Sequence, residues 1–396
     1  MKVVFVSNFM NHHQLPLCNY FFEATDDFKF ICVGTIPENT LKFGYSDLSR
    51  LPYVIKKSAD NIEIVNSAIM NSDVAIFGDC PTEMIYQRVS ANKLSFIFSE
   101  RMWKKGVYRR FIPFIRKKVV DRFTKFKNKD LYVLCASCYL PWDIRLVGFP
   151  VEKCYQWGYF TPFEELDTET TLYEKLPVTT ILWVARFIPL KRCNDLLKAV
   201  KRLKKDGYKF SVRIIGSGQL EEQYRKQIVK YHISECTNII GNMSTENVRT
   251  EMKKAHILAF TSNFIEGWGA VVNEAMNSLC VPVVSHAVGS SRYLIKNGDN
   301  GLIYKMGSNK DLYIKLKSLL DDQNLLMQMQ INAYETIKNE YRGEIAGERF
   351  LNVTKAKLAR EDEEIYKEGP MSCATIIKNN WIKSYGKKIK RNSSRL

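Results

Sequence analysis

Short β-branched runs alternate with helical segments along almost the whole chain, and this alternation limits the possible folds more than any other feature of the sequence. A repeated strand–helix unit predicts parallel strands in a sheet that helices cover on both faces. In the first half we expect strands at 2–6, 29–33, 73–77, 95–98, 131–135 and 154–157. A second series is expected at 179–184, 210–215, 237–240, 256–260, 281–285 and 301–304. The sequence therefore predicts an α/β protein with two doubly wound, Rossmann-like domains.

The alternation breaks once, in an acidic, Thr-rich stretch bounded by Pro162 and Pro177. We interpret residues 161–177 as a linker between domains at 1–160 and 178–345, and residues 346–396 as a C-terminal helix and basic tail. Helices are expected at 191–206, 219–231, 245–254, 269–278, 309–321, 324–339 and 344–360. Since ligands of doubly wound sheets bind at the carboxyl ends of the strands, two such domains predict an interdomain cleft as the binding place.

Composition excludes several classes of protein. The 396 residues are 45% hydrophobic and 26% charged, which is enough for a core and argues against global disorder. No run of about 18 apolar residues predicts a membrane-spanning helix, and the first residues resemble a strand more than a signal peptide. The ten cysteines are scattered, which favours free thiols in a reducing cytoplasm. Cys135 and Cys138 form one CxxC pair, but no second pair completes a zinc site.

Positive charge is concentrated in two segments. Residues 101–129 hold twelve Lys or Arg and one acid, Asp121, which gives a charge of +11 out of the chain's formal +17. Residues 369–396 hold seven Lys or Arg and no acid. The rest of the chain is therefore close to neutral, so a partner that seeks positive charge would meet one of these two patches.

The basic segment 101–129 also carries apolar residues at helical spacing: Val107, Phe111, Phe114, Ile115, Val119, Phe123 and Phe126. This pattern is typical of a basic amphipathic helix on an anionic membrane surface. A helix packed on the sheet with a solvated basic face would show the same periodicity. Nucleic acid ranks lower as a partner, because the chain shows no zinc finger, aromatic RNA-binding signature or other reader module.

The most informative segment runs from Glu266 to Glu274, follows a predicted strand and opens a helix. Gly267 and Gly269 flank the helix start, where backbone must approach a ligand closely, and helix amides suit a diphosphate. Glu274 lies beside apolar residues that must face the sheet, and carboxylates in such a place accept hydrogen bonds from sugar and ribose hydroxyls. The alternative is an ordinary surface loop with two solvated glutamates.

Two further loops of the second domain carry phosphate-binding chemistry. Arg186 and Lys191 follow its first strand, and together they can neutralise a leaving diphosphate, although two ordinary surface cations would look the same. The turn Gly216-Ser217-Gly218 ends the next strand, and such a turn lets a nucleotide lie against backbone amides.

With these three segments in this order, the second domain resembles the nucleotide-sugar-binding half of the retaining glycosyltransferases of family 4, which have the GT-B fold. The similarity covers about residues 178–345, and the Glu266–Glu274 motif followed by a Pro-Val-Val strand is its most specific part. The resemblance implies that Arg186 and Lys191 hold the donor diphosphate, and that neither a metal ion nor another cofactor is needed. It implies that Glu266 and the amides after it hold the donor sugar. The further residues implied to bind the donor are Gly216, Ser217, Gly218, Gly267, Trp268, Gly269, Ala270, Val271 and, at the ribose, Glu274.

The sequence departs from the family pattern in three places. Leu279 stands where members usually have a helix-ending glycine, and a leucine in a left-handed cap costs about 1 kcal/mol. Pro282 comes one residue late. After the first strand the chain has Ser7 to Gln14 in place of the paired-glycine loop of many relatives, which leaves the acceptor side unassigned.

Candidates for the acceptor side follow strands of the first domain. His12 and His13 come after the first strand, where a histidine can contact the acceptor or the transferring sugar, or can simply lie on the surface at a helix start. Glu100 follows the strand 95–98 and can accept a hydrogen bond from the acceptor hydroxyl. A salt bridge from Glu100 to Arg101 or another neighbour is the alternative.

The sequence thus predicts a retaining, metal-independent glycosyltransferase that moves a hexosyl group from a nucleotide-diphosphate sugar, with a UDP-sugar expected. The acceptor is expected to be a glycan or a lipid-linked hydroxyl, and the protein a cytoplasmic one, peripheral at the inner face of the cell membrane, in polysaccharide assembly. Two alternatives stay open: a nucleotide-sugar 2-epimerase of the same fold, and a non-catalytic membrane or nucleic-acid binding protein. An epimerase would leave the basic segment without a purpose. A non-catalytic protein would not need the intact donor-site residues Arg186, Lys191, Glu266 and Glu274. No nucleic-acid partner is expected.

Overall fold

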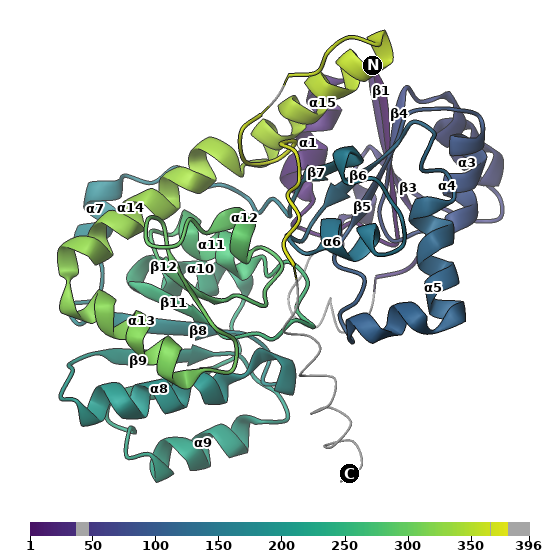
Figure 1. Ribbon diagram of the computed structural model, residues 1–396. Helices are drawn as coiled ribbons and strands as arrows, with labels where there is room; N and C mark the ends of the chain where they lie inside the picture. The colour runs from purple at the N-terminus through teal and green to yellow at the C-terminus, as the bar shows by residue number, and fades with distance from the viewer. Residues whose placement is uncertain (37–46, 365, 379–396) are drawn as a thin grey trace. The chain divides into compact units, whose positions relative to one another are not determined.

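The computed structural model describes residues 1–36, 47–364 and 366–378. They form two compact units (Figure 1). Unit 1 combines Met1–Pro162 with the residues from Tyr341 onward, and unit 2 is Phe163–Glu340. Most of the basic tail predicted at 369–396, from residue 379 on, lies outside the described residues. Among the described residues no helix has the length and apolarity to cross a bilayer.

Unit 1 contains a parallel sheet in the order β3-β2-β1-β4-β5-β6-β7. Its strands are β1 (Lys2–Ser7), β2 (Asp27–Cys32), β3 (Val54–Lys56), β4 (Val74–Phe77), β5 (Ser95–Ser99), β6 (Leu131–Cys135) and β7 (Cys154–Gln156). The middle residues of the central strands are apolar and buried because helices cover both faces of the sheet. Six of the seven were predicted; β3 was not, since it has three residues and its side chains are only partly buried.

Helices α3 (Ile62–Asn71) and α4 (Thr82–Ser90) lie on one face of this sheet, and α1 (Leu15–Ala24) lies on the other (Figure 1). Helix α15 (Gly343–Ala359) packs against α1, although the two helices are far apart in the sequence. The rings of Phe350 in α15 and Phe96 in β5 are 4.9 Å apart, so α15 contributes to the core of unit 1.

After α15, residues 371–374 return to the sheet and pair antiparallel with β7. The backbone N–H of Gln156 donates to the carbonyl of Ser372 at 2.8 Å, and that of Ala374 donates to the carbonyl of Cys154 at 2.9 Å. An exposed strand edge is a template for unwanted pairing, and this short segment covers it.

The basic segment 101–129 does not form the single amphipathic helix that its periodicity predicts. Gly106, with φ of 115°, precedes the 3-10 helix η2 (Val107–Phe111), and Pro113 begins a separate helix α5 (Pro113–Val119). A π-helical turn, η3 (Val120–Thr124), follows. Val107, Val119 and Phe123 are buried, whereas Phe111 and Phe114 are exposed. The apolar positions therefore divide between the core of unit 1 and its surface.

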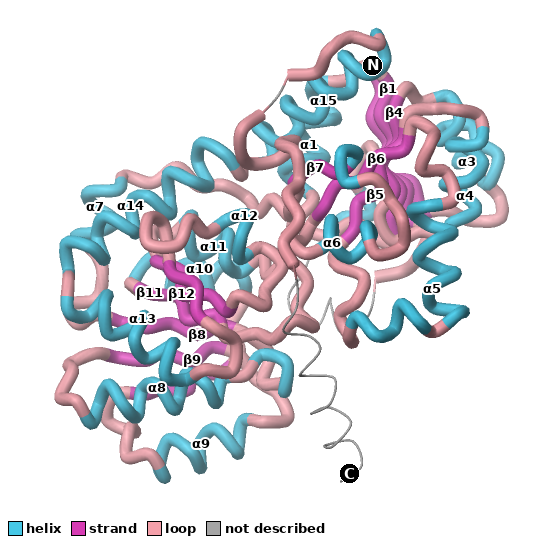
Figure 2. Tube along the Cα trace, in the orientation of Figure 1, coloured by secondary structure: helices cyan, strands magenta, loops and turns pink. Residues whose placement is uncertain are grey.

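Unit 2 contains a six-stranded parallel sheet in the order β10-β9-β8-β11-β12-β13, visible as magenta strands in Figure 2. The strands are β8 (Thr180–Val184), β9 (Ser211–Ile215), β10 (Thr237–Gly241), β11 (Ile257–Phe260), β12 (Val281–Ser285) and β13 (Leu302–Tyr304). All six agree with the predicted strands to within one or two residues at each end.

The helices of unit 2 cover both faces of this sheet. Figure 1 shows α8 (Cys193–Lys205), α9 (Glu221–Lys230) and α13 (Asn309–Asp321) on one face, with α10 (Thr245–Lys254), α11 (Val271–Asn277) and α12 (Ser291–Leu294) on the other. Helix α14 (Gln323–Glu340) packs against α11. The stretch predicted as a linker contains a short helix, α7 (Thr168–Tyr173), and from Phe163 onward it belongs to unit 2. The two doubly wound sheets confirm the predicted fold class.

Candidate active site

The centre of the unit 2 sheet fixes where a ligand can bind. Strands β8 and β11 are neighbours, and the chain runs from β8 outward to β10 on one side and from β11 outward to β13 on the other. The loops after β8 and β11 therefore leave the same edge of the sheet in opposite directions. Such a switch point opens a crevice at the carboxyl ends of the strands, which is where doubly wound sheets hold their ligands.

Hydrogen bonds join these two loops to each other. The Thr261 hydroxyl, directly after β11, donates to the carbonyl of Lys191 at 2.6 Å and accepts from Nε1 of Trp183 in β8 at 2.9 Å. The backbone N–H of Asn263 donates to the carbonyl of Leu190 at 2.9 Å. Lys191 and the residues that follow β11 are thus held in a fixed relation, which is what a binding site made of two loops requires.

Lys191 and Glu266 meet at this place. The Nζ of Lys191 lies 2.5 Å from Oε2 of Glu266, and each side chain is 15% exposed. The Lys191 ammonium also lies 5.3 Å from the centre of the Phe260 ring. The pair offers a cation for a phosphate and a carboxylate for sugar hydroxyls side by side. Arg186, the second predicted cation, is exposed in the loop after β8.

The Gly216-Ser217-Gly218 turn packs against the loop after β8, and only glycine fits at its two ends. Gly216 has φ of 134°, and a Cβ there would lie 2.0 Å from the carbonyl oxygen of Ala185. Gly218 has φ of 147°, and a Cβ there would lie 2.9 Å from the carbonyl oxygen of Phe187. The backbone N–H of Phe187 donates to the carbonyl of Ser217 at 2.8 Å. The structure thus brings this turn beside the segment that holds Arg186.

The loop between Glu266 and α11 is fixed by its own contacts. Gly269 has φ of 86°, and a Cβ there would lie 2.7 Å from the Phe260 ring. The backbone carbonyls of Gly267 and Trp268 accept from the N–H groups of the loop after β12, Gly289 at 2.9 Å and Ser290 at 3.2 Å. Ala270 then caps α11, and Val271 is its first residue. The residues predicted to follow Glu266 in the donor site therefore form one ordered loop.

Glu274 lies inside α11 with Val272, Ala275 and Met276 buried beside it, as its helical position predicts. Its side chain is 10% exposed, and burial raises its pKa to about 7. Nη2 of Arg249 in α10 lies 3.8 Å from Oε1 of Glu274 and partly offsets that increase. Sequence reasoning missed Arg249 because no motif surrounds it, and only the packing of α10 on α11 brings it to Glu274.

The acceptor candidates lie in unit 1. The rings of His12 and His13 are 3.7 Å apart, and His13 meets Tyr159 edge-on at 6.0 Å. Glu100 forms an ion pair with Lys104. This is the salt bridge to a neighbour that the sequence left open, and its partner is Lys104 and not Arg101. Burial, with a smaller effect from Glu100, raises the pKa of the Tyr159 hydroxyl.

The structure also shows where Arg101 and the CxxC pair lie. Arg101 is fully buried and pairs with Asp143 at 3.4 Å, and Asp143 also accepts from the backbone N–H of Met102 and Trp103. Cys135 and Cys138 are both fully buried free thiols, Cys135 at the end of β6 and Cys138 just beyond it.

Comparison with known proteins agrees with this geometry. Residues 164–336, which include Arg186, Lys191, Glu266 and Glu274, match the family model of glycosyl transferases group 1. This domain, which makes up most of unit 2, is therefore a group 1 glycosyltransferase domain. The resemblance seen in the second domain is thereby confirmed at the level of the group.

Curated relatives are similar to different lengths of this chain. An uncharacterized glycosyltransferase of Methanocaldococcus jannaschii is 29% identical over 157 residues, 40% of this chain and 42% of that protein. The capsular polysaccharide biosynthesis glycosyltransferase CapM of Staphylococcus aureus is 23% identical over 328 residues, 74% of this chain and 85% of that protein. The chain thus spans less than half of the first of these relatives.

Solved structures share the fold of both units. HepE of Anabaena, in complex with UDP, matches with a TM-score of 0.68 at 14% identity, covering 90% of this chain and all of that one. A lipopolysaccharide outer core galactosyltransferase, WaaB, matches with a TM-score of 0.65 at 17% identity, covering 90% of this chain and all of that one. At these identities the likeness shows the GT-B fold alone.

Proposed function

We propose that this chain transfers a hexose from a nucleotide-diphosphate sugar, preferably a UDP-sugar, to a hydroxyl of a glycan or lipid-linked acceptor in polysaccharide assembly. The observation that carries the proposal is the Lys191–Glu266 pair at the switch point of unit 2, because it offers phosphate and sugar ligands together. Two similar proteins support it: CapM acts in capsular polysaccharide biosynthesis, and HepE was solved with UDP.

The proposed roles follow from where each side chain lies. Arg186 is exposed and can reach a bound diphosphate, and Lys191 exchanges part of its contact with Glu266 for a phosphate oxygen. Glu266 then accepts hydrogen bonds from the sugar hydroxyls, and Glu274 accepts from the ribose. The loop amides from Gly267 to Val271 line the same edge of the sheet.

The reaction we propose proceeds with retention of configuration. The bond between the anomeric carbon and the diphosphate oxygen breaks, and the bond to the acceptor oxygen forms on the same face of the sugar. The acceptor proton passes to the departing phosphate oxygen, so proton and leaving group balance within the reacting pair. Negative charge accumulates on the diphosphate, and Arg186 and Lys191 stabilise it as it develops. We propose that these cations serve in place of a metal ion, so a chelator should leave transfer unchanged.

Charge stabilisation by two cations makes a specific experiment possible. Arg186→Ala and Lys191→Ala should each lower kcat/KM for sugar transfer by about a hundredfold or more, which corresponds to about 3 kcal/mol. Lys198→Ala, an exposed cation of α8 outside the loops, is the matched control and should keep wild-type turnover. Near-wild-type turnover in both site variants would overturn the assignment. Product analysis separates transfer from 2-epimerisation, since an epimerase changes the sugar without an acceptor.

We further propose that the protein is peripheral at the cytoplasmic face of the membrane through η2 and α5. The observation that supports this is an exposed apolar patch on these elements, with Phe111 72% and Phe114 62% exposed. The cations Arg116, Lys117 and Lys118 of α5 are exposed beside it. Aromatic side chains among cations suit the headgroup region of an anionic bilayer.

A further inference from the structure

Unit 1 has a cavity of about 980 Å³ at the carboxyl ends of its central strands. Its lining comes from the loops after β1, β4 and β5 together with residues of α5 and η3. Strands β1 and β4 are neighbours from which the chain runs outward in opposite directions, so this cavity occupies the switch point of the unit 1 sheet. It has the same relation to its sheet as the Lys191–Glu266 pair has to the sheet of unit 2.

One side of this cavity is acidic and belongs to the sheet. Asp79 follows β4, is exposed to the cavity, and accepts a hydrogen bond from Nδ2 of Asn8 at 3.3 Å. Glu83 lies one turn further on, at the start of α4. Tyr159 and Phe98 add an aromatic wall. Carboxylates beside aromatic rings are typical of sites that bind sugars, because they accept from hydroxyls while the rings cover the apolar face.

Another part of the lining is basic and comes from α5 and the turn after η3: Lys117, Lys118 and Lys125. Lys117 pairs with Asp121 at 2.5 Å. Within the described part of the chain, Lys118 and Lys125 form no ion pair, and their ammonium groups contact aromatic rings. The Lys125 ammonium lies 4.1 Å from the Tyr86 ring. Acidic and basic side chains thus line the same cavity.

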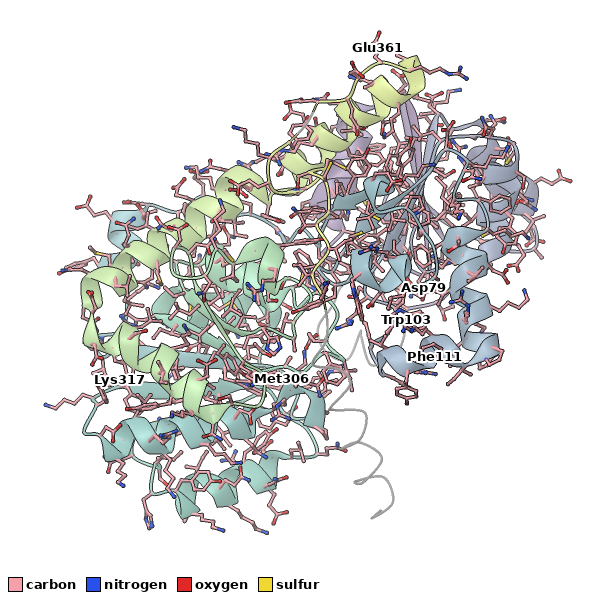
Figure 3. The ribbon with its side chains drawn as sticks, in the orientation of Figure 1. Asp79, Trp103, Phe111, Met306, Lys317 and Glu361 are labelled. Carbon is pink, nitrogen blue, oxygen red and sulfur yellow. The ribbon has the colours of Figure 1, made fainter. Side chains whose placement is uncertain are left out.

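Arg122 holds the two sides together. Its guanidinium donates to the backbone carbonyls of Gly78 and Cys80, the two residues that flank Asp79. The basic segment therefore cannot move far from the acidic loop without breaking these bonds. The same segment also carries the exposed Phe111, labelled with Asp79 in Figure 3. The basic wall of the cavity and the exposed apolar patch are consecutive parts of one segment.

We propose that this cavity binds the headgroup of a membrane lipid whose sugar is joined through a phosphate or diphosphate, and that Lys118 and Lys125 hold the phosphate while Asp79 holds sugar hydroxyls. The inference rests on the proposed function, for which it supplies the class of acceptor. A neutral glycan would leave the cations of the cavity without a role. A free anion would leave the adjoining apolar patch without one.

The phosphate half of the site is tested by binding of farnesyl diphosphate to the full chain in the presence of saturating UDP, which fills the donor site. Lys118→Gln/Lys125→Gln should weaken this binding at least tenfold. Lys127→Gln/Lys129→Gln removes the same charge from exposed positions outside the cavity lining and should change it less than twofold. Equal weakening in the two double variants, or no binding to the wild type, would overturn the proposal.

Two further probes identify the source of the phosphate. Inorganic diphosphate and farnesol should each bind far more weakly than farnesyl diphosphate, because each carries only half of the ligand. Inorganic diphosphate binding as tightly would overturn the lipid assignment. Asp79→Asn should leave farnesyl diphosphate binding intact and raise KM for the acceptor in transfer. UDP affinity, measured in every variant, reports on unit 2 alone, so a failure of the proposed function is seen separately.

Discussion

Leu279 shows how two effects of known size compete at one residue. It ends α11 with φ of 54°, as its place in the motif predicts, and its side chain is fully buried. The left-handed conformation costs a leucine about 1 kcal/mol, whereas removing a buried leucine side chain costs about 2 to 5 kcal/mol. Burial therefore outweighs strain, which explains how a leucine can replace the usual glycine.

This comparison predicts an unusual order of stability. Leu279→Ala loses the packing and keeps the strain, so it should lower the free energy of unfolding by about 3 kcal/mol. Leu279→Gly loses the same packing but relieves the strain, and should be about 1 kcal/mol more stable than the alanine variant. Urea denaturation of the three proteins measures both differences. An alanine variant as stable as the glycine variant, or more stable, would contradict a strained Leu279.

Glu274 predicts a pH dependence of stability. Its pKa rises from the ordinary value of 4.5 to about 7 through burial, so the folded state keeps a proton that the unfolded state has lost. Stability therefore falls as pH rises from 4.5 to 7, by roughly 3 kcal/mol for the 2.5-unit difference. Glu274→Gln should remove that fall, becoming more stable than the wild type at pH 8 while binding UDP more weakly. Denaturation curves at pH 5 and pH 8 that shift in parallel for both proteins would contradict this.

At the scale of elements, the local sequence pattern predicted which strands and helices form. It did not predict which elements they pack against. The strands of unit 2 were found because buried parallel strands are continuous apolar runs. Helix α15 was also found, but periodicity gives the buried face of a helix and not what covers it, so its packing on α1 could not be predicted. The Lys191–Glu266 contact joins residues 75 apart in sequence and follows only from the strand order.

Segment 101–129 shows where periodicity misleads. Seven apolar residues at helical spacing predicted one helix, yet the sequence also contained Gly106 and Pro113, which interrupt it. Its cations are also less available than their number indicates. Lys104 pairs with Glu100, Arg110 stacks on the Phe111 ring at 4.6 Å, and Arg122 binds backbone carbonyls. Only part of the formal charge can face a membrane.

The proposed membrane contact is testable at this element. Phe111→Ser/Phe114→Ser should reduce co-sedimentation with anionic vesicles at low salt, because exposed aromatic area is lost while the charge stays the same. Arg116→Gln/Lys117→Gln should reduce it as well. Added salt should weaken wild-type binding, because at physiological ionic strength charges are screened beyond a Debye length of about 8 Å. Lys226→Gln/Lys230→Gln on α9 of unit 2 is the charge-matched control. Wild-type protein that stays in the supernatant with anionic vesicles would contradict a membrane surface here.

At the scale of the whole molecule, the chain path brings helix α15 back to the N-terminal segment. Unit 1 is completed only when α15 returns to it, after all of unit 2 has been made. Two glycines permit the close approach of α15 to α1: a Cβ on Gly343 would lie 2.7 Å from the backbone of Leu17, and one on Gly347 would lie 2.3 Å from the Tyr20 ring. Phe350 of the same helix then fills the core between Phe21, at 5.4 Å, and Phe96.

This path predicts that a single methyl group in α15 loosens the distant N-terminus. Gly347→Ala places a methyl group against the Tyr20 ring of α1, so the ring and α15 must move apart at a cost of about 1 to 3 kcal/mol. Hydrogen exchange should then quicken in peptides from α1, β1 and α15, while peptides from β8 to β13 and the affinity for UDP stay as in the wild type. Adding Tyr20→Ala removes the ring that the methyl group meets, so the double variant should be less destabilised than the sum of the two single variants. Additive effects, or equal loosening of unit 2, would mean that α15 does not depend on this contact, and that unit 1 is held closed by Phe350 and its aromatic neighbours alone.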